Sequence, residues 1–189
     1  MFTLSKTFGA AALALAGFGL QAEDFTPLMQ VAKTTWPEKT HIGVICDYRT
    51  SQAQVDSLAR AAGPGALITV VDVHQPDKAP LAAQLVARNK ADFLVLLPQD
   101  RLIHDGSFGA TLAIAHLAMQ GVPTVGTTAK ALSQGAVFSM GDGTRGEVMV
   151  TNRLKGTVDV ILPEGIGYSR KASLPLSEGI ATIAVLSMN

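Results

Sequence analysis

Residues 41–73, HIGVICDYRTSQAQVDSLARAAGPGALITVVDV, hold the pattern that decides the fold. Ile42–Cys46 and Leu67–Val73 are largely apolar runs without regular polar alternation, which is typical of parallel strands covered on both faces. Between them, Gln52–Ala62 carries apolar residues at helical spacing, and Gly63-Pro64-Gly65 ends the helix. A strand, a helix and a second strand in this order predict one right-handed crossover unit of a parallel sheet.

The same alternation continues along the chain. Further helices are expected over Lys78–Lys90, Ser107–Gln120 and Thr144–Lys155, and further strands over Phe93–Leu97, Val122–Gly126, Ala136–Met140, Val158–Leu162 and Ile180–Leu186. We therefore predict an α/β fold: a single doubly wound, Rossmann-like or flavodoxin-like domain, with a mostly parallel sheet of five to six strands and helices on both faces. The segment Ser107–Gln120 is apolar almost all round, which predicts a buried helix or an interface.

The first 22 residues have the order of a secretory signal peptide. Lys6 precedes an apolar run from Phe8 to Leu20, and a small residue, Ala22, stands before the first acidic residues. The run is shorter than the roughly 20 residues of a membrane-spanning helix. We expect residues 1–22 to be removed on export, leaving residues 23–189 as one domain in the periplasm.

Composition excludes several classes of protein. The chain has 189 residues, with 15 basic and 15 acidic side chains, so no net charge favours nucleic acid or an anionic membrane. Its 48% of apolar residues is too high for a disordered chain. The single cysteine, Cys46, cannot form an internal disulfide, and its place in an apolar strand predicts burial.

A binding site is expected at the carboxyl ends of the strands, because open parallel sheets bind ligands there. The polar residues that come after the predicted strands are Asp47, Tyr48, Thr50 and Ser51 after the first, Gln99, Asp100 and Arg101 after the third, Thr127 and Thr128 after the fourth, and Asp142 and Gly143 after the fifth. Thr50 or Ser51 also suits the N-cap of the next helix, so each hydroxyl has a purely structural alternative.

Catalytic patterns are weak. No Gly-x-Ser-x-Gly turn is present, and the glycines of residues 141–146 lack the Lys-Ser/Thr ending of a phosphate-binding loop. His104 and Asp105 have no third metal ligand at a convincing spacing. Asp47, Asp100 and Thr127 stand where phosphoacceptor receiver domains place their site, but the lysine that such domains need after the fifth strand is missing. We expect no enzymatic activity, no cofactor and no metal.

From His41 to about Pro163 the chain resembles one lobe of a periplasmic substrate-binding protein of ABC importers, closest to the type linked to tryptophan and tyrosine uptake. The resemblance rests on ADFLVLLP at residues 91–98, GVPTVG at 121–126, SQGA at 133–136 and GDGTRG at 141–146. It implies Rossmann-like lobes that bind a small solute such as an amino acid. Carried over by position, the binding residues are Thr50, Ser51, Gln99, Asp100, Arg101, Thr127, Thr128, Asp142 and Gly143.

Two departures separate this chain from the family. Family members have an acidic residue near Thr127 and Thr128, and they close two lobes around the ligand, whereas one lobe is present here. Two hypotheses remain open. In the first, the protein binds an amino acid or organic acid for an ABC permease, and a second copy or a partner completes the site. In the second, it is a periplasmic accessory protein that contacts a membrane complex, sensor or enzyme without a small ligand.

Overall fold

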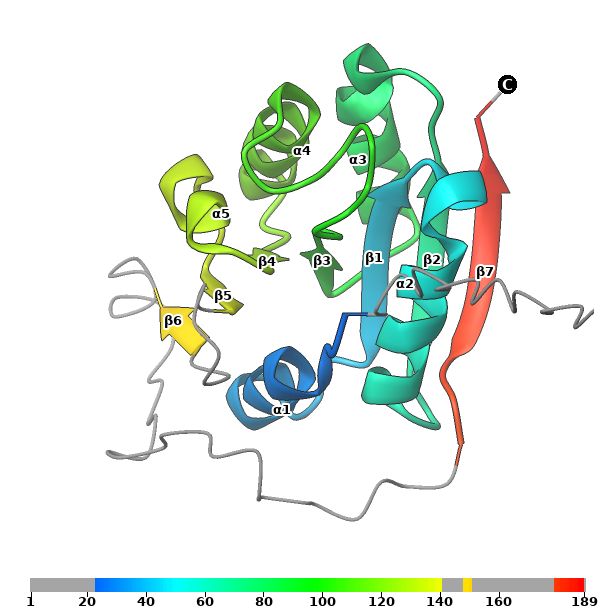
Figure 1. The fold of residues 1–189 in the computed structure, drawn as a ribbon, viewed down its shortest axis with the longest axis vertical. Helices are drawn as coiled ribbons and strands as arrows, with labels where there is room; N and C mark the ends of the chain where they lie inside the picture. The colour runs from blue at the N-terminus through cyan, green and yellow to red at the C-terminus, as the bar shows by residue number, and fades with distance from the viewer. Residues whose placement is uncertain (1–22, 141–147, 151–178, 189) are drawn as a thin grey trace, which may run out of the picture.

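The computed structural model describes residues 23–140, 148–150 and 179–188, and these residues contain one seven-stranded sheet (Figure 1). Its strands are β1 (His41–Cys46), β2 (Leu67–Asp72), β3 (Phe93–Val95), β4 (Thr124–Gly126), β5 (Phe138–Met140), β6 (Val148–Val150) and β7 (Thr182–Ser187), in the order β6-β5-β4-β3-β1-β2-β7. Every neighbouring pair is parallel except β5 and β6, which are antiparallel. The predicted doubly wound α/β fold with a mostly parallel sheet is confirmed.

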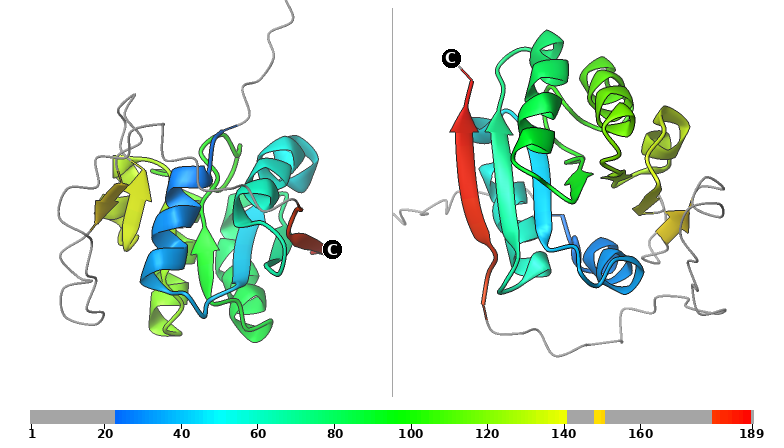
Figure 2. Two further views of the ribbon diagram at one scale, coloured as in Figure 1. Left: turned by 90° about the horizontal axis from the view of Figure 1, so that it is seen from below. Right: turned by 180° about the vertical axis from the view of Figure 1, so that it is seen from behind.

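Helices cover both faces of this sheet. They are α1 (Thr26–Thr35), α2 (Tyr48–Ala62), α3 (Ala79–Arg88), α4 (Phe108–Met119) and α5 (Ala129–Gln134), with a short 3-10 turn, η1 (Pro76–Lys78), before α3. Helices α1 and α2 pack on one face, and α3, α4 and α5 pack on the other, as the view from behind shows (Figure 2). The sheet is therefore the middle layer of three.

Each face of the sheet has its own core, because successive strand residues point to opposite sides. Val44 belongs to the core under α1 and α2, and Ile45 belongs to the core under α3 and α4. Gly43 allows α3 to approach β1 closely, since a Cβ atom at this position would lie 2.5 Å from Val86 Cγ1. Strands buried on both sides account for the unbroken apolar runs of the sequence.

The structure corrects several local predictions. Helix α2 begins at Tyr48 with Asp47 at its N-cap position, so neither Thr50 nor Ser51 caps it. Helices α1 and α5 were not anticipated. The helix expected over Thr144–Lys155 is wrong at Val148–Val150, which form strand β6. The signal peptide at residues 1–22 and the strand expected over Val158–Leu162 lie outside the described residues.

Helix α4 is only partly buried. Ser107 caps it, since its hydroxyl oxygen accepts a hydrogen bond from the Ala110 N–H at 3.1 Å. Ala113 and Leu117 face the sheet, but Phe108 is 69% and Met119 is 78% exposed. In the described part of the chain, no helix is long and apolar enough to cross a membrane.

Candidate functional site

The strand order reverses at β1. The chain runs from β1 to β2 on one side of it and then crosses to β3 on the other, which makes the carboxyl ends of β1 and β3 the place where such sheets bind ligands. Residues from the two ends meet there: the Asp47 N–H, at the end of β1, donates to Asp100 Oδ2 at 2.9 Å. The juxtaposition expected from the sequence is thus present in the structure.

Asp100 holds this edge together. It is 2% exposed, and its Oδ2 accepts hydrogen bonds from the Asp47 N–H and from the Ser51 hydroxyl at 2.7 Å. Its Oδ1 accepts from the N–H groups of Leu102 at 2.9 Å and Ile103 at 2.6 Å. Both oxygens are occupied by the chain itself. Asp100 and Ser51 thus join the loops after β1 and β3, and the expectation that they contact a ligand stays a prediction.

Arg101 is presented outward from the same loop. Its Nη2 donates to Asp47 Oδ2 at 2.9 Å, and the arginine side chain is 66% exposed while that of Asp47 is 5% exposed. The second carboxylate oxygen, Asp47 Oδ1, is buried and has no hydrogen-bond partner. Asp47 therefore fixes a surface cation and keeps one buried oxygen available.

The end of β4 is organised by Asp105. Its Oδ2 accepts hydrogen bonds from the Thr127 N–H at 2.8 Å, from the Thr127 hydroxyl at 3.3 Å and from the Thr128 N–H. The Thr128 hydroxyl in turn caps α5 by accepting from the Lys130 N–H. Burial raises the pKa of Asp105, and the hydrogen bonds from Thr127 and Thr128 oppose that rise. Asp105 ties β4 to the loop before α4, and His104 does not share that task, since its Nδ1 pairs with the Asp100 carbonyl oxygen.

The other predicted residues differ in exposure. Thr50 and Gln99 are exposed and Tyr48 is half-buried, so these side chains lie at the surface of the edge. The Thr50 hydroxyl donates to the Asp47 carbonyl oxygen at 3.1 Å, and the Gln99 N–H donates to Gln54 Oε1 at 3.1 Å. Asp142 and Gly143 lie outside the described residues.

Two residues at this edge were missed by sequence reasoning, Asp72 and His74. Asp72 ends β2 and is 7% exposed, and its Oδ1 accepts from the Tyr48 N–H at 2.9 Å. His74 Nε2 lies 3.7 Å from Asp72 Oδ2. Asp47, Asp72 and His74 each offer one ligand atom within 4.8 Å of the others. In the sequence, this pair is marked by a single aspartate in an apolar strand, followed two residues later by a histidine. It was missed because the predicted strand extended to Val73, so Asp72 was assigned to the strand and not to its carboxyl end.

Cys46 is buried beneath these carboxylates, as its strand position predicts. Burial raises the pKa of its thiol, and the negative charges of Asp100, Asp72 and Asp47 raise it further. The thiol is therefore protonated at neutral pH and is a poor nucleophile.

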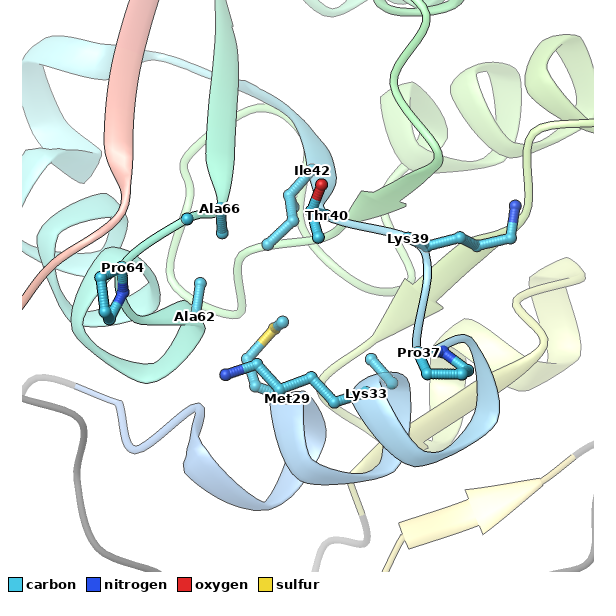
Figure 3. A pocket seen from close by; sticks show the side chains of 11 residues that line it. Met29, Lys33, Pro37, Lys39, Thr40, Ile42, Ala62, Pro64 and Ala66 are labelled. Carbon is cyan, nitrogen blue, oxygen red and sulfur yellow. The ribbon is translucent and has the colours of Figure 1, made fainter.

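A cavity of about 280 Å³ lies at the opposite, amino end of the sheet, between α1 and the turn from α2 to β2 (Figure 3). Its walls are mainly apolar, with Met29, Ile42 and Ala62 among them, and Lys33 and Lys39 add two amines. In Figure 3, Lys33 extends toward Ala62 and Pro64, whereas Lys39 extends the other way. None of the residues predicted to bind a ligand lines this cavity.

Comparison with known proteins supports the fold. No family model matches the sequence, and no curated protein matches it significantly. Among solved structures, the chain is similar to a conserved domain protein from Vibrio cholerae O1 biovar El Tor, with a TM-score of 0.50 and 20% sequence identity. The match covers 63% of this chain and 40% of the Vibrio protein, so this chain spans less than half of that protein's length. At this identity the likeness concerns the fold alone.

Proposed function

We propose that this domain is a periplasmic solute-binding lobe of the type used by ABC importers. Its ligand is a small carboxylate, an amino acid or an organic acid, which binds at the carboxyl ends of β1 and β3. A second copy of the chain or a partner protein covers the bound solute. The doubly wound fold, with its strand order reversing at β1, supports this location.

The observation that carries the proposal is the anchored guanidinium of Arg101. One nitrogen is held by Asp47, while two-thirds of the side chain stays exposed. A guanidinium has five N–H donors in a planar fork that matches a carboxylate, so donors remain for a ligand. Because Asp47 already fixes the arginine, binding costs less side-chain entropy than it would for a free arginine.

Neighbouring side chains provide the remaining contacts. Gln99 and Thr50 are exposed next to Arg101 and Asp47 in the chain, and each can both donate and accept hydrogen bonds. The half-buried ring of Tyr48 offers an apolar surface for the body of a solute. Sites for small ligands bury most of the ligand's surface, so the opposite wall must come from another polypeptide surface.

Ligand-dependent thermal stabilisation tests the proposal. The purified protein is screened against amino acids and small organic acids, and a ligand at about 100 times its Kd is expected to add about 2.7 kcal/mol of stability. Arg101→Gln should abolish the response to the same ligand. Arg60→Gln, which changes an exposed arginine in the last turn of α2, is the matched control and should keep the response. Absence of any response, or an unchanged response in Arg101→Gln, would overturn the proposal.

The accessory-protein hypothesis is favoured by one observation, the exposed apolar side chains of α4. Phe108 and Met119 lie at the two ends of this helix and are 69% and 78% exposed, so both apolar side chains are accessible to a partner. This function predicts that a double change of Phe108 and Met119 to Ser abolishes co-purification with a membrane complex, whereas Arg101→Gln does not. A protein that responds to no solute and loses its partner in this way would establish the accessory function in place of transport.

A further inference from the structure

The geometry points to a divalent transition-metal site formed by Asp47, Asp72 and His74 at the carboxyl ends of β1 and β2. Such a site shares Asp47 with the proposed function, in which this residue anchors Arg101, but its other two ligands, Asp72 and His74, have no part in the proposed solute site. It contradicts the expectation from the sequence that the chain binds no metal.

The sheet brings the three residues together. Strands β1 and β2 are parallel and in register, with Cys46 opposite Asp72, so Asp47 and His74 come after strand ends that lie side by side. One ligand atom from each of the three side chains lies within 4.8 Å of the other two. The two aspartates are buried, while the side chain of His74 is 55% exposed.

The second observation is the buried oxygen of Asp47. Only 5% of the Asp47 side chain is exposed. Arg101 binds one of its two carboxylate oxygens, Oδ2. Oδ1 has no hydrogen-bond partner. A buried carboxylate oxygen without a donor is unfavourable, because it has lost its water without gaining a replacement. A metal ion bound by this carboxylate would supply the missing partner.

Asp72 is already oriented as a metal ligand would be. The Tyr48 N–H binds its Oδ1 at 2.9 Å and leaves Oδ2 facing His74 Nε2 at 3.7 Å. Metal-binding carboxylates are commonly held by a hydrogen bond of this kind, which fixes the direction of the free oxygen. The backbone of α2 therefore prepares Asp72 for a ligand on the side of His74.

The charge at this edge favours a cation. Asp47, Asp72 and Asp100 are all buried, and hydrogen bonds join the Asp47 N–H to Asp100 and the Tyr48 N–H to Asp72, so the three carboxylates lie in one region. Within the described residues, the ion pairs at this edge involve one arginine, Arg101, and the histidine itself. A divalent ion between Asp47 and Asp72 would offset the excess negative charge.

Two carboxylate oxygens and an imidazole nitrogen favour zinc over magnesium or calcium. Zn²⁺ binds His and Asp at about 2.0–2.2 Å, and three protein ligands leave a fourth position open. Mg²⁺ and Ca²⁺ prefer oxygen ligands alone. Ligand atoms on a tetrahedral zinc lie about 3.3 Å apart, so the cluster must contract by up to about 1.5 Å. The His74 side chain, which is 55% exposed, has room to move toward the ion.

Metal titration of the untagged protein tests the inference. After treatment with EDTA, the protein is titrated with ZnCl₂ by isothermal calorimetry, and the bound metal is counted by mass spectrometry. We expect one Zn²⁺ per chain, with MgCl₂ failing to compete. His74→Ala should weaken binding at least ten-fold without changing the melting temperature of the metal-free protein, because its side chain is exposed. His104→Gln alters another histidine of the same edge and should bind zinc as the unmodified protein does.

Substitution with Co²⁺ gives a spectroscopic signal that reports metal coordination directly and does not arise from a change in protein stability. A tetrahedral site with one histidine and two carboxylates should develop visible d–d absorption on binding Co²⁺, and His74→Ala should lose it. Binding of less than one equivalent, or binding unchanged in His74→Ala, would overturn the inference. The outcome is separable from the proposed function, because Arg101→Gln should lose the solute response and keep zinc, whereas His74→Ala should do the reverse.

Discussion

The two ends of the sheet are built in opposite ways. At the carboxyl end, buried aspartates accept hydrogen bonds from the chain itself, as Asp100 does from three N–H groups and one hydroxyl. At the amino end, helix α1 and the turn before β2 leave a cavity of about 280 Å³ with mainly apolar walls. The Asp100 cluster and this cavity thus lie at different ends of the sheet. The strand order predicts a ligand site at the carboxyl end, which is not where this cavity lies.

The largest expected effect is a difference in stability between variants of two aspartates, one at each end of the sheet. Asp100→Ala should lower the free energy of unfolding by about 3–5 kcal/mol, because three N–H groups and a hydroxyl lose a charged acceptor. Asp92, at the amino end, accepts from the N–H groups of Thr40 and His41 near the surface. Asp92→Ala should cost about 1–2 kcal/mol. Urea unfolding measures both, and equal losses would show that the carboxyl end is not the more tightly held.

A second comparison uses glycines. A Cβ atom at Gly126, in β4, would lie 2.0 Å from Ala131 Cβ, so Gly126→Ala should destabilise the protein by about 2–4 kcal/mol. Gly65 borders the amino-end cavity and has φ of +85° with nothing within 4 Å of the added atom. Gly65→Ala should cost only about 1 kcal/mol, from backbone strain alone. Thermal melts of the two variants should rank in this order, and the reverse order would contradict the close packing at β4.

The smallest effect concerns pH. The pKa of Asp105 is raised in the folded protein, so just above the ordinary aspartate pKa the folded state binds more protons than the unfolded state. Stability should therefore fall as pH rises through this window. Asp105→Asn should remove that fall, because the amide does not titrate, while its oxygen still accepts the N–H of Thr127. Urea unfolding from about pH 4 to about pH 7 measures it. Asp92→Asn is the control. The prediction would be contradicted if the unmodified protein became more stable, relative to Asp105→Asn, as the pH rises.

Much of the fold was predictable because long elements carry their own signal. β1, β2 and α2 have unbroken apolar runs or a clear helical period, and the structure places each within four residues of its expected bounds. The shift in α2 goes with a long-range contact: the Ser51 hydroxyl donates to Asp100, 49 positions along the chain, and Ser51 does not cap the helix. Helix α5 has six residues, too few to show a period.

Other failures arose where a segment's environment outweighed its own pattern. Val148–Val150 pair with β5 as an antiparallel strand although the surrounding residues favoured a helix, because strand formation depends on the neighbouring edge of the sheet. In α4, an almost uniformly apolar sequence predicted a buried helix or an interface; one face is buried while Phe108 and Met119 are exposed in the single chain, and an interface stays a prediction. The sequence could not show which face of α4 is buried, because its few polar residues do not form a distinct solvent-facing side.

The sequence alone determined the class of fold and the edge of the sheet that carries the polar residues, since both depend on local periodicity and on the residue types just after each strand. Only the tertiary structure decided the role of each polar side chain. Asp47, Asp72 and Asp100 look alike in the sequence, but one binds Arg101, one faces His74 and one is fully occupied by N–H and hydroxyl donors. The physical reason is that one decisive partner of each aspartate is 24 to 54 positions away, a distance over which chain order does not specify a contact.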